Sequence, residues 1–188
     1  MIQIAIFASG GGSNAKAILQ YFQGHSTIAI QSILSNRKEA GVFDHAKSFC
    51  INSIHWSKSN FDSQEFTLQK LQGIDVIVLA GFLLKVPEYL TKAFEGRIIN
   101  IHPALLPKYG GKGMYGMNVH RAVFEAQEKE TGITIHLVDE EFDHGEHLFQ
   151  KKINIESASS AEEISEKVLK LEHKHFAPTI ERFIENHF

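Results

Sequence analysis

The spacing of apolar residues predicts that strands and helices alternate along the chain. Residues 2–7 are rich in β-branched isoleucine and nearly all apolar, which is typical of a strand buried on both faces of a parallel sheet. After a glycine-rich turn, apolar residues recur at helical spacing over residues 15–22, with Ser13 or Asn14 available as the N-cap and Gly24 placed to end the helix. The start of the chain is therefore one strand–turn–helix unit.

The same alternation continues through the middle of the chain. Strands are predicted at residues 28–34, 76–80 and 98–101, and helices at residues 42–49, 62–71 and 87–94. Asp62 and Glu65 have the spacing of a capping box, and Pro87 can open a helix. This pattern predicts an α/β domain with a Rossmann-like, mainly parallel sheet and flanking helices.

The last third of the chain has a different pattern. Strands at residues 131–138 and 148–155 are predicted to be neighbours, and their acidic connection is compatible with an antiparallel arrangement. From Ser160, an amphipathic helix is predicted to run toward Phe176, and Pro178 is expected to bend or restart it. Residues 103–117 form the longest predicted loop, and long loops in compact domains are usually functional or mobile.

Composition narrows the class of protein. The 188 residues suit a single domain, and 43% hydrophobic with 22% charged residues is typical of soluble globular proteins. A net charge of −3 provides no positive field for nucleic acid, so no nucleic-acid partner is expected. The single cysteine, Cys50, excludes an intramolecular disulfide and favours a cytoplasmic location. The apolar opening, residues 1–8, is too short for an export signal or a membrane span, so neither is expected.

The glycine-rich turn after the first strand is a candidate phosphate site. Main-chain amides of Gly11, Gly12, Ser13 and Asn14 can approach an anion, and the helix start adds its positive end. The alternative is a tight turn that merely requires a positive φ. A dinucleotide fingerprint fits poorly because its last glycine would fall at Ala15, and the ATP-binding P-loop lacks its Gly-Lys-Ser/Thr. A monophosphate is the favoured ligand.

A second candidate site lies at the end of the strand at residues 98–101. Asn100 and His102 are two residues apart, so their side chains should face the same side. An amide donor beside an imidazole suits stabilisation of an oxyanion together with proton transfer. A capping Asn and a His satisfied by backbone would fit the spacing equally well. Asp143, in the acidic segment 139–143, would by composition alone be a solvated carboxylate.

Four motifs together carry a family resemblance. They are Gly12-Ser13-Asn14, Leu79 to Phe82, Asn100 to Pro107, and Asp143-His144-Gly145 seven residues after His136. In order and spacing the sequence resembles the folate-dependent formyltransferases, and within them the glycinamide ribonucleotide formyltransferases. The resemblance implies one formyltransferase domain over residues 1–188, in which the N-terminal half binds phosphate and ribonucleotide and the C-terminal half binds folate.

The resemblance also implies a reaction and its participants. The formyl group of 10-formyltetrahydrofolate would pass to the amine of glycinamide ribonucleotide, giving formylglycinamide ribonucleotide and tetrahydrofolate in de novo purine biosynthesis. Asn100, His102 and Asp143 would be the catalytic residues, His136 would help to order the site, and Glu172 would contact the ribose hydroxyls. The residues expected to bind folate are Phe82, Leu83, Leu84, Val86, Asn100, Glu140 and Asp143.

Other ligands and partners are expected to be few. No metal is predicted, because the histidine pairs 144/147 and 173/175 lack a third ligand. Partners are expected to be the two small-molecule substrates, without nucleic acid or membrane, and the protein is expected to be a monomer or homodimer. A methionyl-tRNA formyltransferase would need an added RNA-binding domain, and a deformylating hydrolase an added regulatory domain. A non-catalytic phosphate-binding module remains an alternative, because it would keep the glycine turn without requiring Asn100, His102 and Asp143.

Two segments depart from the family pattern. Leu83-Leu84 occupy positions where the best-known members have Met-Arg, so a basic side chain expected near folate is missing, and Lys85 could replace it. The segment from Lys108 to Gly116 is longer than in the short bacterial form, and its glycines would permit a lid. Lys108 or Lys112 could then meet a phosphate or the glutamate tail of folate.

Overall fold

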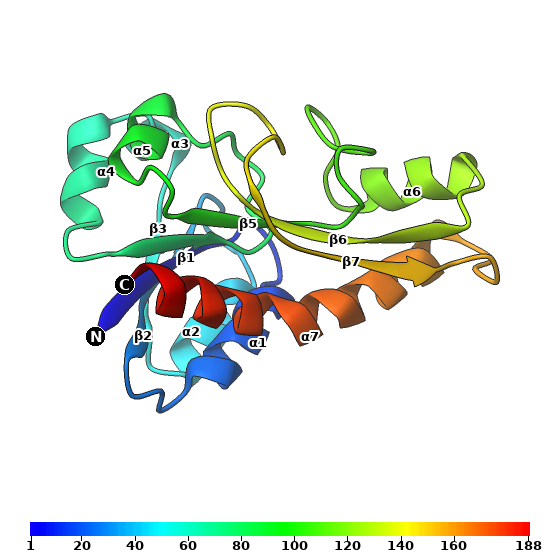
Figure 1. Ribbon diagram of the computed structural model, residues 1–188. Coiled ribbons are helices and arrows are strands. Elements are labelled where there is room, and N and C mark those ends of the chain that lie inside the picture. Colours follow the sequence, from blue (N-terminus) through cyan, green and yellow to red (C-terminus); the bar gives the residue numbers. More distant parts are fainter.

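One seven-stranded sheet organises the molecule, in the order β3-β2-β1-β4-β5-β6-β7 (Figure 1). The computed structural model describes residues 1–188. The strands are β1 (Ile2–Phe7), β2 (Ile28–Ser35), β3 (Asn52–His55), β4 (Val76–Leu79), β5 (Ile98–His102), β6 (Glu130–Leu137) and β7 (His147–Asn154). β1 to β5 pair in parallel, whereas β6 is antiparallel to both β5 and β7. The predicted α/β class, the mainly parallel sheet and the antiparallel final pair are confirmed.

Helices cover both faces of this sheet. They are α1 (Ser13–Phe22), α2 (Val42–Ser48), α3 (Lys58–Phe61), α4 (Gln64–Lys70), α5 (Glu88–Ala93), α6 (Met117–Glu125) and α7 (Ala161–His187). Figure 1 shows α1, α2 and α7 on one side of the sheet and α3, α4 and α5 on the other. No helix is both long enough and apolar enough to cross a membrane.

The central strand β1 explains why the sheet has a core on each face. Ile4 and Ile6 belong to the larger core, which also contains side chains of α1, α6 and α7, whereas Ala5 and Phe7 belong to the smaller core beneath α3 and α5. Successive strand residues point to opposite faces, so a strand between two cores must be apolar at every position. The continuous apolar run of β1 is therefore the signature of this double burial.

Several local predictions were wrong at helix ends. The N-cap of α1 is Gly12, without a side-chain cap bond, and both Ser13 and Asn14 lie in the first helical turn. Asp62 ends α3 and does not cap α4, whose N-cap is Ser63. The predicted capping residue of α7 is confirmed, because the Ser160 hydroxyl accepts a hydrogen bond from the Glu163 amide at 3.2 Å. Sequence spacing alone cannot distinguish a cap from the residue beside it.

The structure also contains elements that the apolar pattern does not predict. β3 is a short and mostly exposed edge strand. In α6 only three residues are buried, Val119, His120 and Val123. α7 continues as one helix through Pro178, so the helix does not restart there. Proline removes one helical hydrogen bond, but Phe176 and Ile180 on either side are buried in the larger core, and this packing offsets the loss.

Candidate active site

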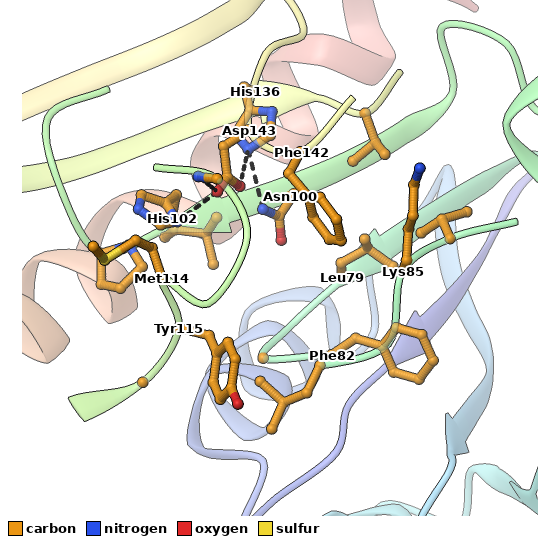
Figure 2. A pocket seen from close by; sticks show the side chains of 18 of the residues that line it. Leu79, Phe82, Lys85, Asn100, His102, Met114, Tyr115, His136, Phe142 and Asp143 are labelled. Carbon is orange, nitrogen blue, oxygen red and sulfur yellow. Dashed lines mark hydrogen bonds and ion pairs between the residues drawn. The ribbon is translucent and has the colours of Figure 1, made fainter. Parts of the chain in front are cut away.

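A cavity of about 560 Å³ lies at the carboxyl ends of β4 and β5, where open α/β sheets commonly bind ligands. Its wall is built from residues 79–86, 100–103, 111–117 and 138–143, together with the middle of α7. Figure 2 shows polar side chains gathered on one wall and the apolar Leu79 and Phe82 on another. Segments far apart in sequence thus meet around one space.

Asn100, His102, His136 and Asp143 form a polar cluster on this wall (Figure 2). Asn100 and His136 are directly paired across the antiparallel strands β5 and β6, and Asn100 Nδ2 donates to His136 Nε2 at 3.0 Å. His136 Nδ1 donates to the Leu137 carbonyl at 2.8 Å, which assigns the ring proton to Nδ1 and leaves Nε2 as the acceptor. His136 therefore orients Asn100, and one Asn100 N–H stays available to a ligand.

The second strand residue, His102, presents a free basic nitrogen. His102 Nε2 donates to the Tyr109 carbonyl at 2.8 Å, and Nδ1 lies 3.6 Å from Asp143 Oδ2. Burial lowers the pKa of His102, although the Asp143 carboxylate and the bond to Tyr109 oppose that shift. The ring is therefore neutral at pH 7, its proton is on Nε2, and Nδ1 can accept another.

The carboxylate of this cluster comes from the loop between β6 and β7. Asp143 Oδ2 accepts a hydrogen bond from the Gly111 amide at 2.8 Å, and Asp143 Oδ1 lies 3.6 Å from His136 Nε2. Burial by itself raises the pKa of Asp143, but the Gly111 amide and the positive charge that His136 and His102 carry when protonated outweigh it, so the pKa lies below the ordinary 3.8. Asp143 is ionised at neutral pH and ready to stabilise a proton on His102 Nδ1.

Local contacts hold the Asp143 loop in shape. Asp143 has a φ of 55°, in the left-handed region, so the loop must impose this conformation. Gly145 presses on the end of β6, where a Cβ would lie 1.9 Å from the Leu137 carbonyl oxygen. Inside the loop, the Asp139 carboxylate accepts hydrogen bonds at 2.8 Å from the Glu141 amide and from His144 Nδ1. These contacts fix the chain on both sides of Asp143.

A second polar group in the cavity joins α1 to α7. Asn14 Nδ2 donates to Glu172 Oε2 at 2.6 Å across 158 residues of sequence, and both side chains line the cavity. Burial raises the pKa of Glu172 to about 7, although the bond from Asn14 opposes it. Asn14 Oδ1 is buried without a hydrogen-bond partner. Buried polar atoms are normally hydrogen-bonded, so Asn14 Oδ1 is an acceptor suited to a donor group that enters the cavity.

The predicted phosphate turn, residues 11–14, ends at Asn14. Gly12 has a φ of 75°, and a Cβ there would lie 2.5 Å from Val42 Cγ2, so glycine is required. The amides of Gly11, Gly12 and Ser13 make no hydrogen bond within the protein. These amides, at the positive end of α1, form a natural anion site, although the three residues themselves do not line the large cavity.

The residues predicted to bind folate all line the large cavity. Phe82, Leu83, Leu84, Val86 and Glu140 join Asn100 and Asp143 around it. The Lys85 ammonium lies 5.5 Å from the centre of the Phe142 ring, so a cation bridges the two loops that form this wall. Lys112 also lines the cavity, whereas Lys108 pairs with Glu128 at 2.9 Å beside a separate, smaller cavity.

Sequence reasoning missed several residues of the site. Met114, Tyr115 and His120 line the cavity, but they lie in the long loop and in α6, where the apolar pattern gave no signal. Ser9 connects the end of β1 to the segments after β2 and β4. Its hydroxyl donates to Asn36 Oδ1 at 2.6 Å and accepts from the Leu83 amide at 2.9 Å. In the sequence, a serine that follows a buried apolar run could have indicated this polar contact at the end of the strand. No group of three or more His, Cys, Asp or Glu side chains is arranged to hold a metal ion.

Comparison with known proteins agrees with this architecture. The phosphoribosylglycinamide formyltransferase of Bacillus subtilis is 33% identical over 191 residues, covering 98% of this chain and 95% of its own length. Crystal structures of glycinamide ribonucleotide transformylase 1 from Symbiobacterium toebii (28% identical, TM-score 0.89) and of phosphoribosylglycinamide formyltransferase from Bacillus halodurans (33% identical, TM-score 0.86) share the fold. They cover 99% and 97% of this chain, and 89% and 95% of their own chains are matched.

Longer relatives match as well. The chloroplastic phosphoribosylglycinamide formyltransferase of Arabidopsis thaliana is 36% identical over 186 residues, which is 95% of this chain but 64% of that protein, and the chain spans 61% of the corresponding Vigna unguiculata protein. The sequence model of the family described as formyl transferase matches residues 2–180. The match spans the whole sheet and all the residues of the polar cluster, and the chain belongs to the formyl transferase family.

Proposed function

We propose that this protein transfers the formyl group of 10-formyltetrahydrofolate to the amine of glycinamide ribonucleotide. One observation carries the proposal: a neutral His102 presents its free Nδ1 to the ionised Asp143, beside the Asn100 amide, in a cavity large enough for substrates. A module that only binds phosphate has no use for this base and donor. The relatives named for the same activity support the assignment.

The cavity suits the formyl donor. Phe82, Leu84 and Val86 provide an apolar wall for a flat bicyclic ring, and Glu140 provides an acceptor for ring N–H groups. Lys85 and Lys112 provide positive charge for the acidic tail of folate. Because Lys108 is paired with Glu128 away from this cavity, we assign it no contact with either substrate.

The other polar features suit the acceptor. The free amides of Gly11, Gly12 and Ser13 would bind the phosphate, as the positive end of a helix favours an anion. The Asn14–Glu172 pair would bind the ribose hydroxyls, which can donate to Asn14 Oδ1 and to the Glu172 carboxylate. In this proposal the N-terminal turn and α7 bind the ribonucleotide, and the loops after β4 and β6 bind folate.

The polar cluster would then perform the transfer. As the acceptor nitrogen attacks the formyl carbon, negative charge gathers on the formyl oxygen, and the free N–H of Asn100 stabilises it. The attacking nitrogen gives its proton to His102 Nδ1, directly or through one water, and Asp143 stabilises the resulting imidazolium. Collapse breaks the bond to the folate nitrogen, which takes that proton from His102. Only the protonated His102 can also donate to the oxyanion, because the N–H of the neutral ring is bound to Tyr109.

An absorbance assay for loss of the formyl group tests the proposal. We expect conversion of 10-formyltetrahydrofolate to tetrahydrofolate with glycinamide ribonucleotide present, and formation of the formylated nucleotide, but little conversion without the acceptor. Equal conversion with and without acceptor would indicate a hydrolase, and no conversion would indicate a binding module. The monomeric or homodimeric state and the cytoplasmic location remain predictions, which gel filtration and fractionation would test.

A further inference from the structure

The residue that holds His102 is itself held in an unusual conformation. Tyr109 has a φ of 57°, in the left-handed region that bulky side chains rarely adopt, and its carbonyl accepts the hydrogen bond from His102 Nε2 at 2.8 Å. A residue keeps such a conformation only when its surroundings impose it. The contacts of the Tyr109 side chain are part of those surroundings, together with the bond from the nearby Gly111 amide to Asp143.

Those contacts lie outside the large cavity. The Tyr109 ring packs against the larger core, and its hydroxyl donates to Glu128 Oε1 at 2.9 Å. Glu128 also pairs with Lys108 at 2.9 Å, and its amide bonds to the Val123 carbonyl at 3.3 Å, which fixes it at the junction of α6 and β6. Figure 2 shows the other side of this network, where His102 and Asp143 face the cavity.

Two acceptors compete for the single proton of the neutral His102 ring. The Tyr109 carbonyl holds the proton on Nε2, whereas the Asp143 carboxylate, 3.6 Å from Nδ1, attracts a proton to Nδ1. A proton on Nδ1 would remove the free base that faces the reacting groups. The function of His102 thus depends on the Tyr109 carbonyl staying in line with Nε2.

We propose that Glu128 is a positioning residue, which acts through the Tyr109 hydroxyl to keep the Tyr109 carbonyl on His102 Nε2 and so keeps His102 Nδ1 free to accept a proton. The role in turnover rests on the proposed formyl transfer, but the choice of tautomer does not. Neither Glu128 nor the Tyr109 hydroxyl belongs to the large cavity, so their effect reaches the substrates only through His102.

Nitrogen-15 NMR of the histidine rings, combined with kinetics, tests this proposal. The His102 signals are identified by their absence in His102→Ala. We expect the wild type to carry the proton on Nε2, and Tyr109→Phe and Glu128→Ala to shift it toward Nδ1. In both variants kcat should fall roughly tenfold, which is typical when a histidine loses the hydrogen-bond partner that orients its ring. Both KM values should stay within about twofold of the wild-type values.

Two further variants serve as controls. Glu128→Gln keeps an oxygen that accepts from Tyr109, so it should restore the wild-type tautomer and kcat. Glu130→Ala removes a neighbouring carboxylate that pairs with Lys152 at 3.1 Å without touching Tyr109, and it should resemble the wild type. Unchanged His102 signals in Tyr109→Phe would overturn the proposal. If the wild type itself transfers no formyl group, the proposed function fails while the NMR result still decides the role of Glu128.

Discussion

The two polar groups in the cavity differ in how fully the protein satisfies them. In the polar cluster of Asn100, His102, His136 and Asp143, strand pairing and main-chain bonds fix the ring protons and the orientation of the amide. The Asn14–Glu172 pair has one short hydrogen bond, and Asn14 Oδ1 has no partner. Burial raises the pKa of the Glu172 carboxyl to about 7.

This difference predicts that one group acts in the chemical step and the other in substrate binding. Groups that are held before the substrate arrives need no reorganisation in the transition state, so they act on the chemical step. Buried groups that lack partners are costly until a ligand supplies them, so they act on binding. We therefore expect changes in the polar cluster to lower kcat, and changes near Asn14 and Glu172 to alter acceptor KM and stability.

The largest effect should come from removing charge without changing shape in the polar cluster. Asp143→Asn should fold and bind folate, yet lose kcat by roughly 10²- to 10⁴-fold, because the imidazolium loses its carboxylate.

The pKa of His102 lies below the ordinary 6.5 in the wild type, so the acid limb of the rate profile should lie below pH 6.5, with an apparent pKa that belongs to the coupled pair. Without the Asp143 charge, which raises the pKa of His102, the limb should move to lower pH. Rates from pH 5 to 9 on both proteins check this, and superimposable profiles with similar turnover would show that Asp143 is a solvated loop residue.

The next effect concerns stability at the Asn14–Glu172 pair. The pKa of Glu172 is about 7 in the folded protein against an ordinary 4.5, so its contribution is fully present below pH 4.5 and is lost as pH rises through 7. Glu172→Gln carries no charge and should escape that loss, becoming more stable than the wild type by about 2–3 kcal/mol at pH 8.5 and nearly equal to it at pH 4. Urea unfolding at both pH values measures the difference. If the difference in unfolding free energy between the two proteins is the same at both pH values, the pKa of Glu172 is not raised in the folded protein.

A binding effect of intermediate size should come from the glycine turn. Gly12→Val places a β-branched side chain at a φ of 75° against Val42, which displaces the free amides. We expect the KM for glycinamide ribonucleotide to rise by roughly tenfold, with little change in the KM for folate. Steady-state titration of each substrate measures both values. If the two KM values rise equally, the turn has no special role in binding the phosphate.

The smallest effect should come from the ion pair between His144 and Asp139, which lies inside the Asp143 loop. His144 and Asp139 are exposed, and such pairs contribute at most about 1 kcal/mol, so His144→Ala should lower kcat only by about two- to fivefold. The KM for glycinamide ribonucleotide should stay unchanged, because His144 does not line the cavity. Kinetics of His144→Ala beside Lys152→Ala, a matched loss of an exposed ion pair on β7, separate a specific effect from a general one.

Sequence could predict the parts of the site that lie on regular strands. Alternation along β5 placed Asn100 and His102 on one side, and the apolar run of β1 predicted its place inside the sheet. The glycine turn, whose phosphate binding stays a prediction, is visible in the sequence as three glycines between a strand and a helix. Along the strands the backbone geometry is regular, so residue spacing determines the direction of each side chain.

The remaining features depend on contacts between distant segments. Asp143 points into the cavity because of a left-handed φ and the amide of Gly111, 32 residues away, and Glu172 meets Asn14 across 158 residues. Spacing contains no information about such contacts, and only the family resemblance indicated Asp143 and Glu172. The tautomer of His102 depends on the Tyr109 carbonyl, which no sequence pattern indicated.

In the proposed function the polar cluster performs the chemical step, and a single-turnover measurement on His102→Ala is the sharpest test of that role. Enzyme in excess of radiolabelled glycinamide ribonucleotide, with saturating 10-formyltetrahydrofolate, isolates formyl transfer from substrate binding and product release. We expect the rate to fall by at least roughly 10²-fold relative to the wild type, with the acceptor still bound. A His102→Ala rate close to that of the wild type would contradict the account.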